Sequence, residues 1–153
     1  IPPTDLIAQA RLTLCFFQSG NVGYPSRVLR PAKGLHSVDQ AYVEYDGKVT
    51  DTDELVEVLN AEMKRLVESG GKTCTKIMAY DDARKACGGF LPSFVDPVSH
   101  PRVVVILNDT EGCPCGGTHV GDVGDIGVVT ICAIRVKKKV TRVSYAIQGM
   151  TRG

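Results

Sequence analysis

Two residues that commonly bind metal ions, Cys115 and His119, lie four positions apart in the stretch CPCGGTHVGDVGDIG, residues 113–127. Between them stand Gly116 and Gly117, which allow the backbone to turn tightly, so that both side chains can point at one centre. Zinc prefers this nitrogen and sulfur ligation, but it needs four ligands, or three protein ligands and a water molecule. The stretch therefore supplies half of a zinc site, and other residues must supply the rest.

The stretch lies between two apolar segments that are expected to be strands. The segment VVVIL precedes it and VVTICAI follows it. We expect a buried strand over residues 102–108. We also expect an antiparallel hairpin of strands 126–136 and 141–148, joined through residues 137–139.

Two helices are predicted from apolar residues that recur at helical spacing, at residues 4–18 and 51–69. For the second, Asp51 with Glu54 resembles a capping box, and Gly70-Gly71 is a stop signal. Its apolar stripe is expected to lie in the core and consists of Leu55, Leu59, Met63, Leu66 and Val67.

The other expected elements are short. They are a strand at 26–29 ended by Pro31 and Gly34, a strand at 38–45, a strand at 76–80, a helix at 81–86 and an irregular segment at 90–101. Helices and strands mixed without a βαβ rhythm indicate an α+β fold with a mainly antiparallel sheet and helices packed on one side. The 153 residues predict one domain, residues 1–153. Because the chain does not begin with Met, we expect further residues upstream of Ile1.

The composition is that of an ordinary folded domain, with 43% hydrophobic and 23% charged residues. No apolar run approaches the roughly 20 residues of a membrane span, and the first residues lack the pattern of a secretory signal. We therefore expect no membrane partner.

The net charge of +1 argues against a generally basic nucleic-acid binder, and we expect no DNA partner. Basic residues nevertheless gather toward the C-terminal end, at Arg135, Lys137, Lys138, Lys139, Arg142 and Arg152. Such a patch can bind phosphates. The alternative interpretation is a solvated turn that lysines keep soluble.

The spacing of the six cysteines is not that of a disulfide-stapled secreted scaffold, so we expect a reduced, cytoplasmic protein. Cys15 and Cys132 lie in apolar surroundings and are expected to be buried small hydrophobes. Cys74 and Cys87 are expected to be ordinary thiols.

The motif Cys-Gly-Gly-Thr-His-Val at residues 115–120, followed by Gly-Asp-Ile-Gly at 124–127, resembles the second half of the editing domain of alanyl-tRNA synthetases. The same domain occurs in threonyl-tRNA synthetase and in free-standing, AlaX-like trans-editing proteins. The order of expected elements is also similar, and residues 142–149 match the family's closing pattern. The resemblance covers nearly the whole chain and implies an editing-domain-like fold.

Members of this family hydrolyse mischarged aminoacyl-tRNA, typically removing serine or glycine from tRNA for alanine. The resemblance therefore implies a trans-acting deacylase whose partner is the acceptor end of a mischarged tRNA. Zinc in the family is bound by an HxxxH pair on the first helix and by the Cys and His of the later motif, which implies ligands at Cys115 and His119. A bound metal can polarise the ester carbonyl or activate a water. The residues expected to contact the substrate are Gly116, Gly117, Thr118, Lys137, Lys138 and Arg142.

The HxxxH pair of the family is missing. The segment similar to it is Ile-Pro-Pro-Thr-Asp, in which Ile1 and Asp5 stand in place of the two histidines. Isoleucine cannot bind metal, whereas the Asp5 carboxylate can. Two interpretations follow. In one, Asp5, Cys115 and His119 hold zinc with a water in the fourth position, and these three residues are catalytic.

In the other interpretation the zinc site has decayed, and the domain binds tRNA or a protein partner without hydrolysis. Cys115 is then a buried thiol, and His119 is satisfied by backbone hydrogen bonds. Cys113 offers either an extra sulfur ligand or a disulfide with Cys115, but geometry disfavours two sulfurs on one metal across a single proline, so we place Cys113 beside the site. A third possibility is metal-independent hydrolysis of another small acylated substrate, with Asp5 or Cys115 as the reactant.

Overall fold

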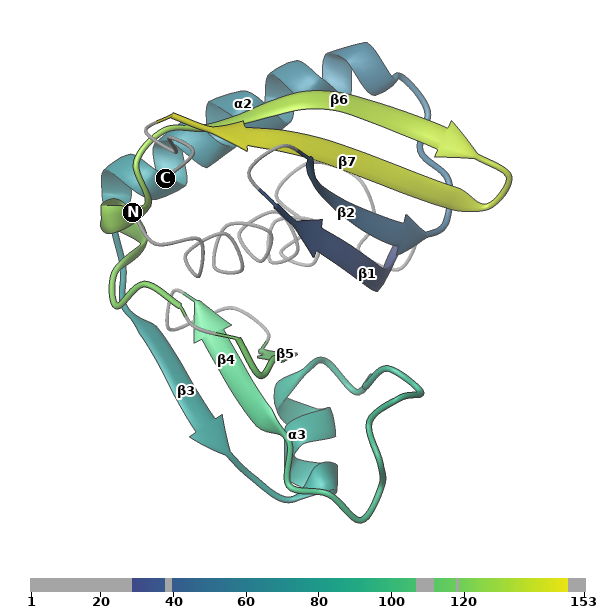
Figure 1. Ribbon diagram of the computed structural model, residues 1–153, viewed down its shortest axis with the longest axis vertical. Coiled ribbons are helices and arrows are strands. Elements are labelled where there is room, and N and C mark those ends of the chain that lie inside the picture. Colours follow the sequence, from purple (N-terminus) through teal and green to yellow (C-terminus); the bar gives the residue numbers. More distant parts are fainter. Residues whose placement is uncertain (1–28, 38–39, 107–111, 118, 149–153) are drawn as a thin grey trace.

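A computed structural model of the chain describes residues 29–37, 40–106, 112–117 and 119–148 (Figure 1). The predicted helix at 4–18, which includes Asp5, and most of the predicted strand at 26–29 lie outside the described residues. The described elements are β1 (Arg30–His36), β2 (Ala41–Asp46), α2 (Thr52–Ser69), β3 (Thr73–Ile77), α3 (Tyr80–Ala86), β4 (Arg102–Ile106), β5 (Cys113–Pro114), η2 (Val123–Ile126), β6 (Val129–Lys137) and β7 (Val140–Ile147).

Four strands form one antiparallel sheet in the order β1-β2-β7-β6. The predicted hairpin is confirmed, because β6 and β7 pair with each other and are joined through Lys138 and Lys139. Lys138 has a φ of 56°. A positive φ at the first turn residue is typical of the primed turns that match the twist of hairpin strands. Figure 1 shows the β6–β7 hairpin extending beyond the end of β2.

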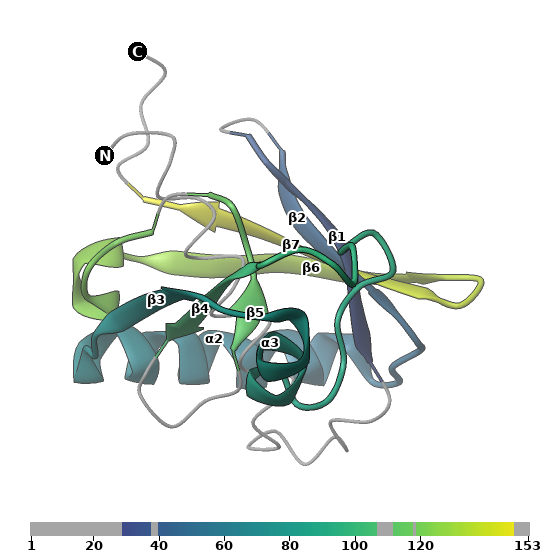
Figure 2. The same cartoon turned by 90° about the horizontal axis from the view of Figure 1, so that it is seen from below.

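Helix α2 packs against β6 on one face of this sheet (Figure 2). The predicted apolar stripe is confirmed, because Leu55, Leu59, Met63 and Leu66 are buried and Val67 packs against their cluster. On β2 and β7 of the facing sheet, the buried apolar residues Val43, Tyr45, Val143 and Tyr145 occupy alternate positions, as a sheet with one covered face requires. On β6 the buried residues include Ile131 and Ile134. None of the described helices combines the length and apolar composition that crossing a bilayer requires.

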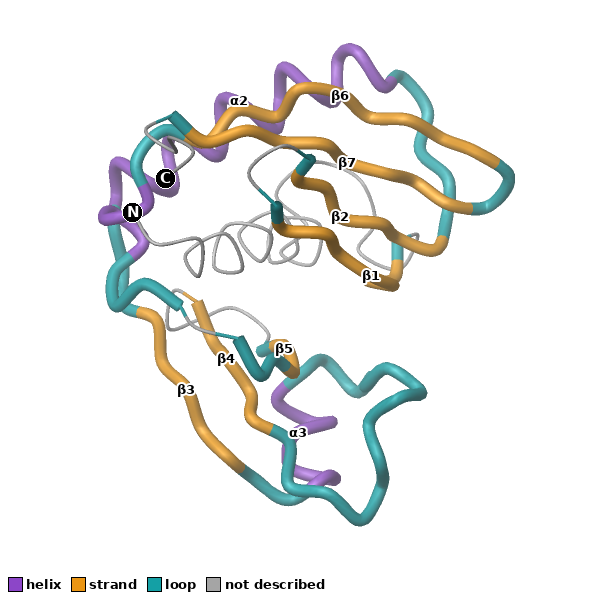
Figure 3. Tube along the Cα trace, viewed as in Figure 1, coloured by secondary structure: helices purple, strands orange, loops and turns teal. Residues whose placement is uncertain are grey.

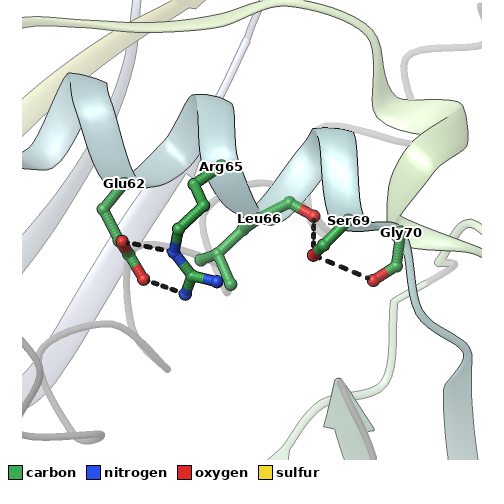
Figure 4. Close-up of polar contacts among 5 residues, drawn as sticks. All are labelled: Glu62, Arg65, Leu66, Ser69 and Gly70. Atoms are coloured by element: carbon green, nitrogen blue, oxygen red, sulfur yellow. Dashed lines mark hydrogen bonds and ion pairs between the residues drawn. The ribbon is translucent and has the colours of Figure 1, made fainter.

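The start of α2 differs from the predicted capping box. Asp51 is the N-cap residue but has φ 52° and ψ 49° and makes no side-chain cap hydrogen bond, so that prediction is wrong. A capping side chain normally reaches the helix from an extended backbone, which the left-handed conformation of Asp51 is not. The stop signal is confirmed: Gly70 has φ 63° and its N–H donates to the Val67 carbonyl. Figure 4 shows this end, where Ser69 Oγ donates to the Leu66 carbonyl at 2.9 Å, one turn beyond the Glu62–Arg65 ion pair.

An asparagine fixes α2 on β6. Asn60 Nδ2 donates to the Ile131 carbonyl at 3.0 Å, and the Ile131 N–H donates to Asn60 Oδ1 at 2.8 Å. The register of β6 shifts between Ile131 and Ala133, where a β-bulge lies. Cys132 is exposed, so the prediction that it is a buried small hydrophobe is wrong. Strand alternation turns Cys132 outward, and the bulge then returns Ile134 to the core.

The predicted end of the first strand at Pro31 and Gly34 is also wrong, because β1 runs through both residues. β1 is an edge strand, and its register shifts between Pro31 and Lys33. Proline lacks a backbone N–H and is tolerated at sheet edges and bulges. Pro31 and Gly34 therefore do not end the strand, because an edge strand can contain both residues.

The remaining strands form a second antiparallel sheet in the order β3-β4-β5 (Figure 3). A small core of Ala83, Cys87, Leu91 and Val103 joins α3 and the following segment to β4. The α+β class with antiparallel strands is confirmed, but the described strands lie in two sheets where the sequence predicted one. The predicted irregular segment before β4 is confirmed, since no helix or strand is assigned over residues 90–101.

The packing at Gly112 yields a stability prediction. A Cβ at Gly112 would lie 2.5 Å from Val103 Cγ1 and 3.2 Å from the Ala86 carbonyl oxygen. Val103 is 1% exposed and its branched side chain has little freedom to move. We predict that Gly112→Ala lowers the free energy of unfolding by about 1–3 kcal/mol, measured by urea denaturation.

Gly121→Ala is the matched control, because nothing lies within 4 Å of a Cβ at Gly121. It should change the same free energy by less than about 1 kcal/mol. Equal stability of the Gly112→Ala variant and the wild type would contradict the close packing of Gly112 on Val103.

Candidate functional site

The Cys/His stretch begins as a short strand at the inner edge of the second sheet. β5 pairs with β4, with Cys113 opposite Val104 and Pro114 opposite Val103. The ladder continues for one further bond, since the Cys115 N–H donates to the Arg102 carbonyl at 2.9 Å. Cys115 is half-buried and packs against the main core. The strand pairing thus sets where the turn begins.

The side chain of Arg102 holds the turn itself. Its Nη1 donates to the Cys115 carbonyl at 2.8 Å and to the Gly117 carbonyl at 2.6 Å. Arg102 was missed as a site residue by the sequence reasoning, which treated it only as the first residue of a buried strand. A single charged residue that begins the apolar run RVVVI was the available signal. The sequence does not show which backbone carbonyls that residue bonds to, because every residue has a carbonyl.

Within the turn, the Gly117 N–H points at the Cys115 sulfur, with 3.4 Å between nitrogen and Sγ. The Cys115 thiol is free, so the alternative of a Cys113–Cys115 disulfide is not realised. Gly116 is exposed, and a Cβ there would meet nothing within 4 Å. The open space above Gly116 could therefore admit a ligand. Thr118 lies outside the described residues.

His119 is half-buried, and both of its ring nitrogens are shielded from solvent. The structure places Cys115 and His119 on one short loop, as the sequence predicted. The described residues contain no group of three or more His, Cys, Asp or Glu side chains arranged to hold a metal ion. The third ligand of the predicted site, Asp5, lies outside the described residues, so the ligand set stays a prediction.

Asp122 fixes the far end of the loop. Its Oδ1 accepts hydrogen bonds from the Gly71 N–H at 3.0 Å and the Gly124 N–H at 2.9 Å. These two bonds, Gly71 first, hold the pKa of Asp122 below its ordinary value. Asp122 also caps η2, which explains why β6 begins later than predicted. This aspartate was another residue that the sequence reasoning missed, although an acidic residue before a glycine turn is a familiar capping signal.

The predicted basic contacts lie in the β6–β7 hairpin. Lys137 and Lys138 are exposed at the hairpin turn, and Arg142 lies in β7. Their role as substrate contacts stays a prediction.

Arg142 is fixed by its neighbours on β2. Its Nε and Nη2 donate to Glu44 Oε1 at 2.9 and 2.6 Å, and its guanidinium carbon lies 4.0 Å from the centre of the Tyr42 ring. Lys33 Nζ lies 3.2 Å from Glu44 Oε2. The hydrogen bond from Arg142, assisted by Lys33, holds the pKa of Glu44 below its ordinary value against the opposing effect of burial.

No protein-family model matches the chain. Among curated proteins, the alanine–tRNA ligase of Paramagnetospirillum magneticum (strain ATCC 700264 / AMB-1) is 35% identical to it over 80 residues. Half of the chain is similar to part of an alanine–tRNA ligase. The aligned region covers 52% of this chain but only 9% of the ligase. The matched relative is an alanine–tRNA ligase, a member of the family that the Cys-Gly-Gly-Thr-His motif resembles.

We predict that Arg102→Ala loosens the Cys/His turn. The variant loses two charge-assisted hydrogen bonds to the Cys115 and Gly117 carbonyls. Hydrogen exchange at the Gly117 amide, followed by mass spectrometry or NMR, should become faster by about 10-fold or more. Arg84→Ala, which removes an exposed arginine from α3, serves as the control and should leave this amide unchanged. Unaltered exchange in Arg102→Ala would show that the strand pairing alone holds the turn.

The lowered pKa of Asp122 predicts a pH dependence of stability. Its folded-state pKa lies below the unfolded value of about 3.9, so the carboxylate contributes stability above that pH and loses it as the pH falls through the folded-state pKa. Asp122→Asn keeps the acceptor oxygen but removes the charge. The urea midpoint of this variant should therefore fall less than that of the wild type between about pH 6 and about pH 3.

Asp125→Asn is the control for this measurement, because it removes the same charge from an exposed position in the same turn. It should follow the wild-type pH profile. If Asp122→Asn and Asp125→Asn give the same profile, the bonds to Gly71 and Gly124 do not depend on the charge of Asp122.

Proposed function

We propose that the chain is a trans-acting deacylase that hydrolyses mischarged tRNA for alanine, with a serine or glycine ester as its substrate. The observation that carries the proposal is the turn from Cys115 to His119, which presents two potential metal ligands on a loop that Arg102 fixes. The similarity to part of an alanine–tRNA ligase supports tRNA for alanine as the class of RNA.

Zinc is the cofactor that suits this donor set. Sulfur from Cys115, nitrogen from His119 and a carboxylate oxygen from Asp5 are ligand types that zinc accepts, with a water in the fourth position. When bound there, zinc would supply polarisation of the ester carbonyl or an activated water. The shielded ring nitrogens of His119 and the half-buried sulfur of Cys115 fit a ligand role, because a metal site needs its donors withdrawn from bulk water.

The chain's own residues would position the ester. Gly116 leaves open space on the exposed side of the turn, and Gly117 and Thr118 follow it directly. Such small residues leave room for a serine or glycine ester beside the turn. Lys137, Lys138 and Arg142 would contact phosphates of the acceptor end.

A second candidate function is binding without hydrolysis, in which the domain holds tRNA or a protein partner. One specific observation favours it: Ile1 stands where the family has a histidine, and isoleucine cannot bind metal. Under this alternative Cys115 and His119 only support the turn, and the basic hairpin carries the interaction.

The test is the deacylation rate on tRNA for alanine that carries serine, together with zinc content by elemental analysis. We expect Cys115→Ala, His119→Ala and Asp5→Ala each to lower the rate by about 100-fold or more. Wild-type protein should hold about one zinc per chain, and Cys115→Ala should lose it. Cys74→Ala is the matched control, because Cys74 is an exposed thiol on β3 and should not affect either quantity.

Wild-type rates in both Cys115→Ala and His119→Ala would contradict the proposed metal mechanism. A wild-type protein that binds the tRNA but neither hydrolyses the ester nor takes up zinc would instead support the alternative of binding without hydrolysis.

A further inference from the structure

A row of charged side chains crosses the outward face of the four-stranded sheet. Backbone pairing places Lys33 of β1 opposite Glu44 of β2, and Glu44 opposite Arg142 of β7. Arg142 in turn lies opposite Arg135 of β6, and Lys137 follows on the same face two residues later. We call the four cationic residues Lys33, Arg142, Arg135 and Lys137 the outer basic row.

This face is the one turned away from the apolar core. Val43 and Val143 are buried in the main cluster, and they flank Glu44 and Arg142 in their strands. Because successive strand residues point to opposite faces, the charged residues point outward. The side chains of Lys33 and Arg142 are 66% and 44% exposed, so both can be reached from solvent.

Charges within the row are not balanced. The single carboxylate of Glu44 serves both Lys33 and Arg142. Within the described part of the chain, no carboxylate lies within ion-pair distance of Arg135 or Lys137. Like charges directly opposite on neighbouring strands destabilise a sheet, and Arg135 faces Arg142 in this way. The fold alone gives no reason for this pairing, whereas a polyanionic ligand would.

The guanidinium of Arg142 is already ordered before any ligand binds. Its bonds to Glu44 and its position over the Tyr42 ring fix the guanidinium while nearly half of the side chain stays exposed. A guanidinium that is already ordered loses less conformational freedom when it binds a phosphate. The remaining N–H groups can still donate to an oxyanion.

We infer that the outer basic row binds the sugar–phosphate backbone of an RNA, with Arg135 and Lys137 as direct phosphate contacts and Arg142 as a fixed anchor. Charge complementarity points to the ligand class, since a cationic stripe on one face of a domain is the electrostatic footprint of nucleic-acid binding. The inference rests on the proposed function for the identity of the RNA, and it extends the contact surface from the hairpin turn across the sheet to Lys33.

The test measures binding of a fluorescein-labelled RNA hairpin with a single-stranded 3′ end and no attached amino acid, by anisotropy over a salt titration. Arg135→Gln/Lys137→Gln should weaken binding by about 10-fold or more at about 0.1 M salt, and should reduce the slope of log K against log salt by about 1.5–2. Lys64→Gln/Lys85→Gln removes the same charge from exposed lysines of α2 and α3, and should change affinity by less than about 3-fold. Thermal unfolding checks that both variants fold.

Equal weakening in the two double variants would overturn the inference, because binding would then depend on net charge and not on this face. Unchanged binding in Arg135→Gln/Lys137→Gln, or absence of binding by the wild type, would overturn it as well. The inference would also be overturned if the wild-type protein bound vesicles of anionic phospholipid but not the RNA hairpin. Because the RNA hairpin carries no ester, its binding tests this inference alone. The hydrolysis rate of Cys115→Ala tests the proposed function, so the two can fail separately.

Discussion

The carboxylate of Asp122 accepts hydrogen bonds from both segments that connect the two sheets. The outgoing passage follows α2 and enters β3, and the return passage follows β5 and enters β6. Asp122 Oδ1 accepts from Gly71 on the first passage and from Gly124 on the second. Backbone bonds between the Thr73 N–H and the Gly121 carbonyl and between the Val123 N–H and the Gly71 carbonyl reinforce this junction. Val104 of β4 is also buried in the main core, so apolar packing and this junction together hold the second sheet against the first.

The Cys/His turn is a consequence of the same junction. The segment after β5 must return to the four-stranded sheet, and Asp122 fixes its far end just as Arg102 fixes its near end. Both anchors are charged side chains that bond to backbone groups, and hydrogen bonds with one charged partner are stronger than those between two neutral groups. The two ends of the turn are thus held in place, while Gly116 is exposed. The positions of Cys115 and His119 therefore depend on Arg102 and Asp122, which bond to the backbone on either side of them.

Sequence periodicity was sufficient for the parts of the fold that bury apolar surface. The stripe of α2 and the alternation of β6 and β7 were predictable, because burial imposes a repeat on the residue types. The anchors were not predictable in this way. Arg102 and Asp122 bond to backbone atoms, which every residue carries, so their partners have no sequence signature. The wrong predictions at Asp51 and Pro31 have a different cause. The capping sequence does not show that the backbone of Asp51 is left-handed, and the proline does not show that β1 is an edge strand.

The candidate site has fixed residues, Cys115 and Gly117, on either side of the exposed Gly116, and this arrangement favours ligand binding. Ordering a loop residue costs about 1–2 kcal/mol of backbone entropy, and a ligand that had to order the whole turn would lose that much affinity for each residue. Here folding has already fixed Cys115 and Gly117, because their carbonyls are bonded to Arg102. Gly116, between these two residues, is exposed and has open space where a side chain would be. A metal ion or an ester that binds there would meet a backbone already set in position, which is the condition under which a short loop can serve as a specific site.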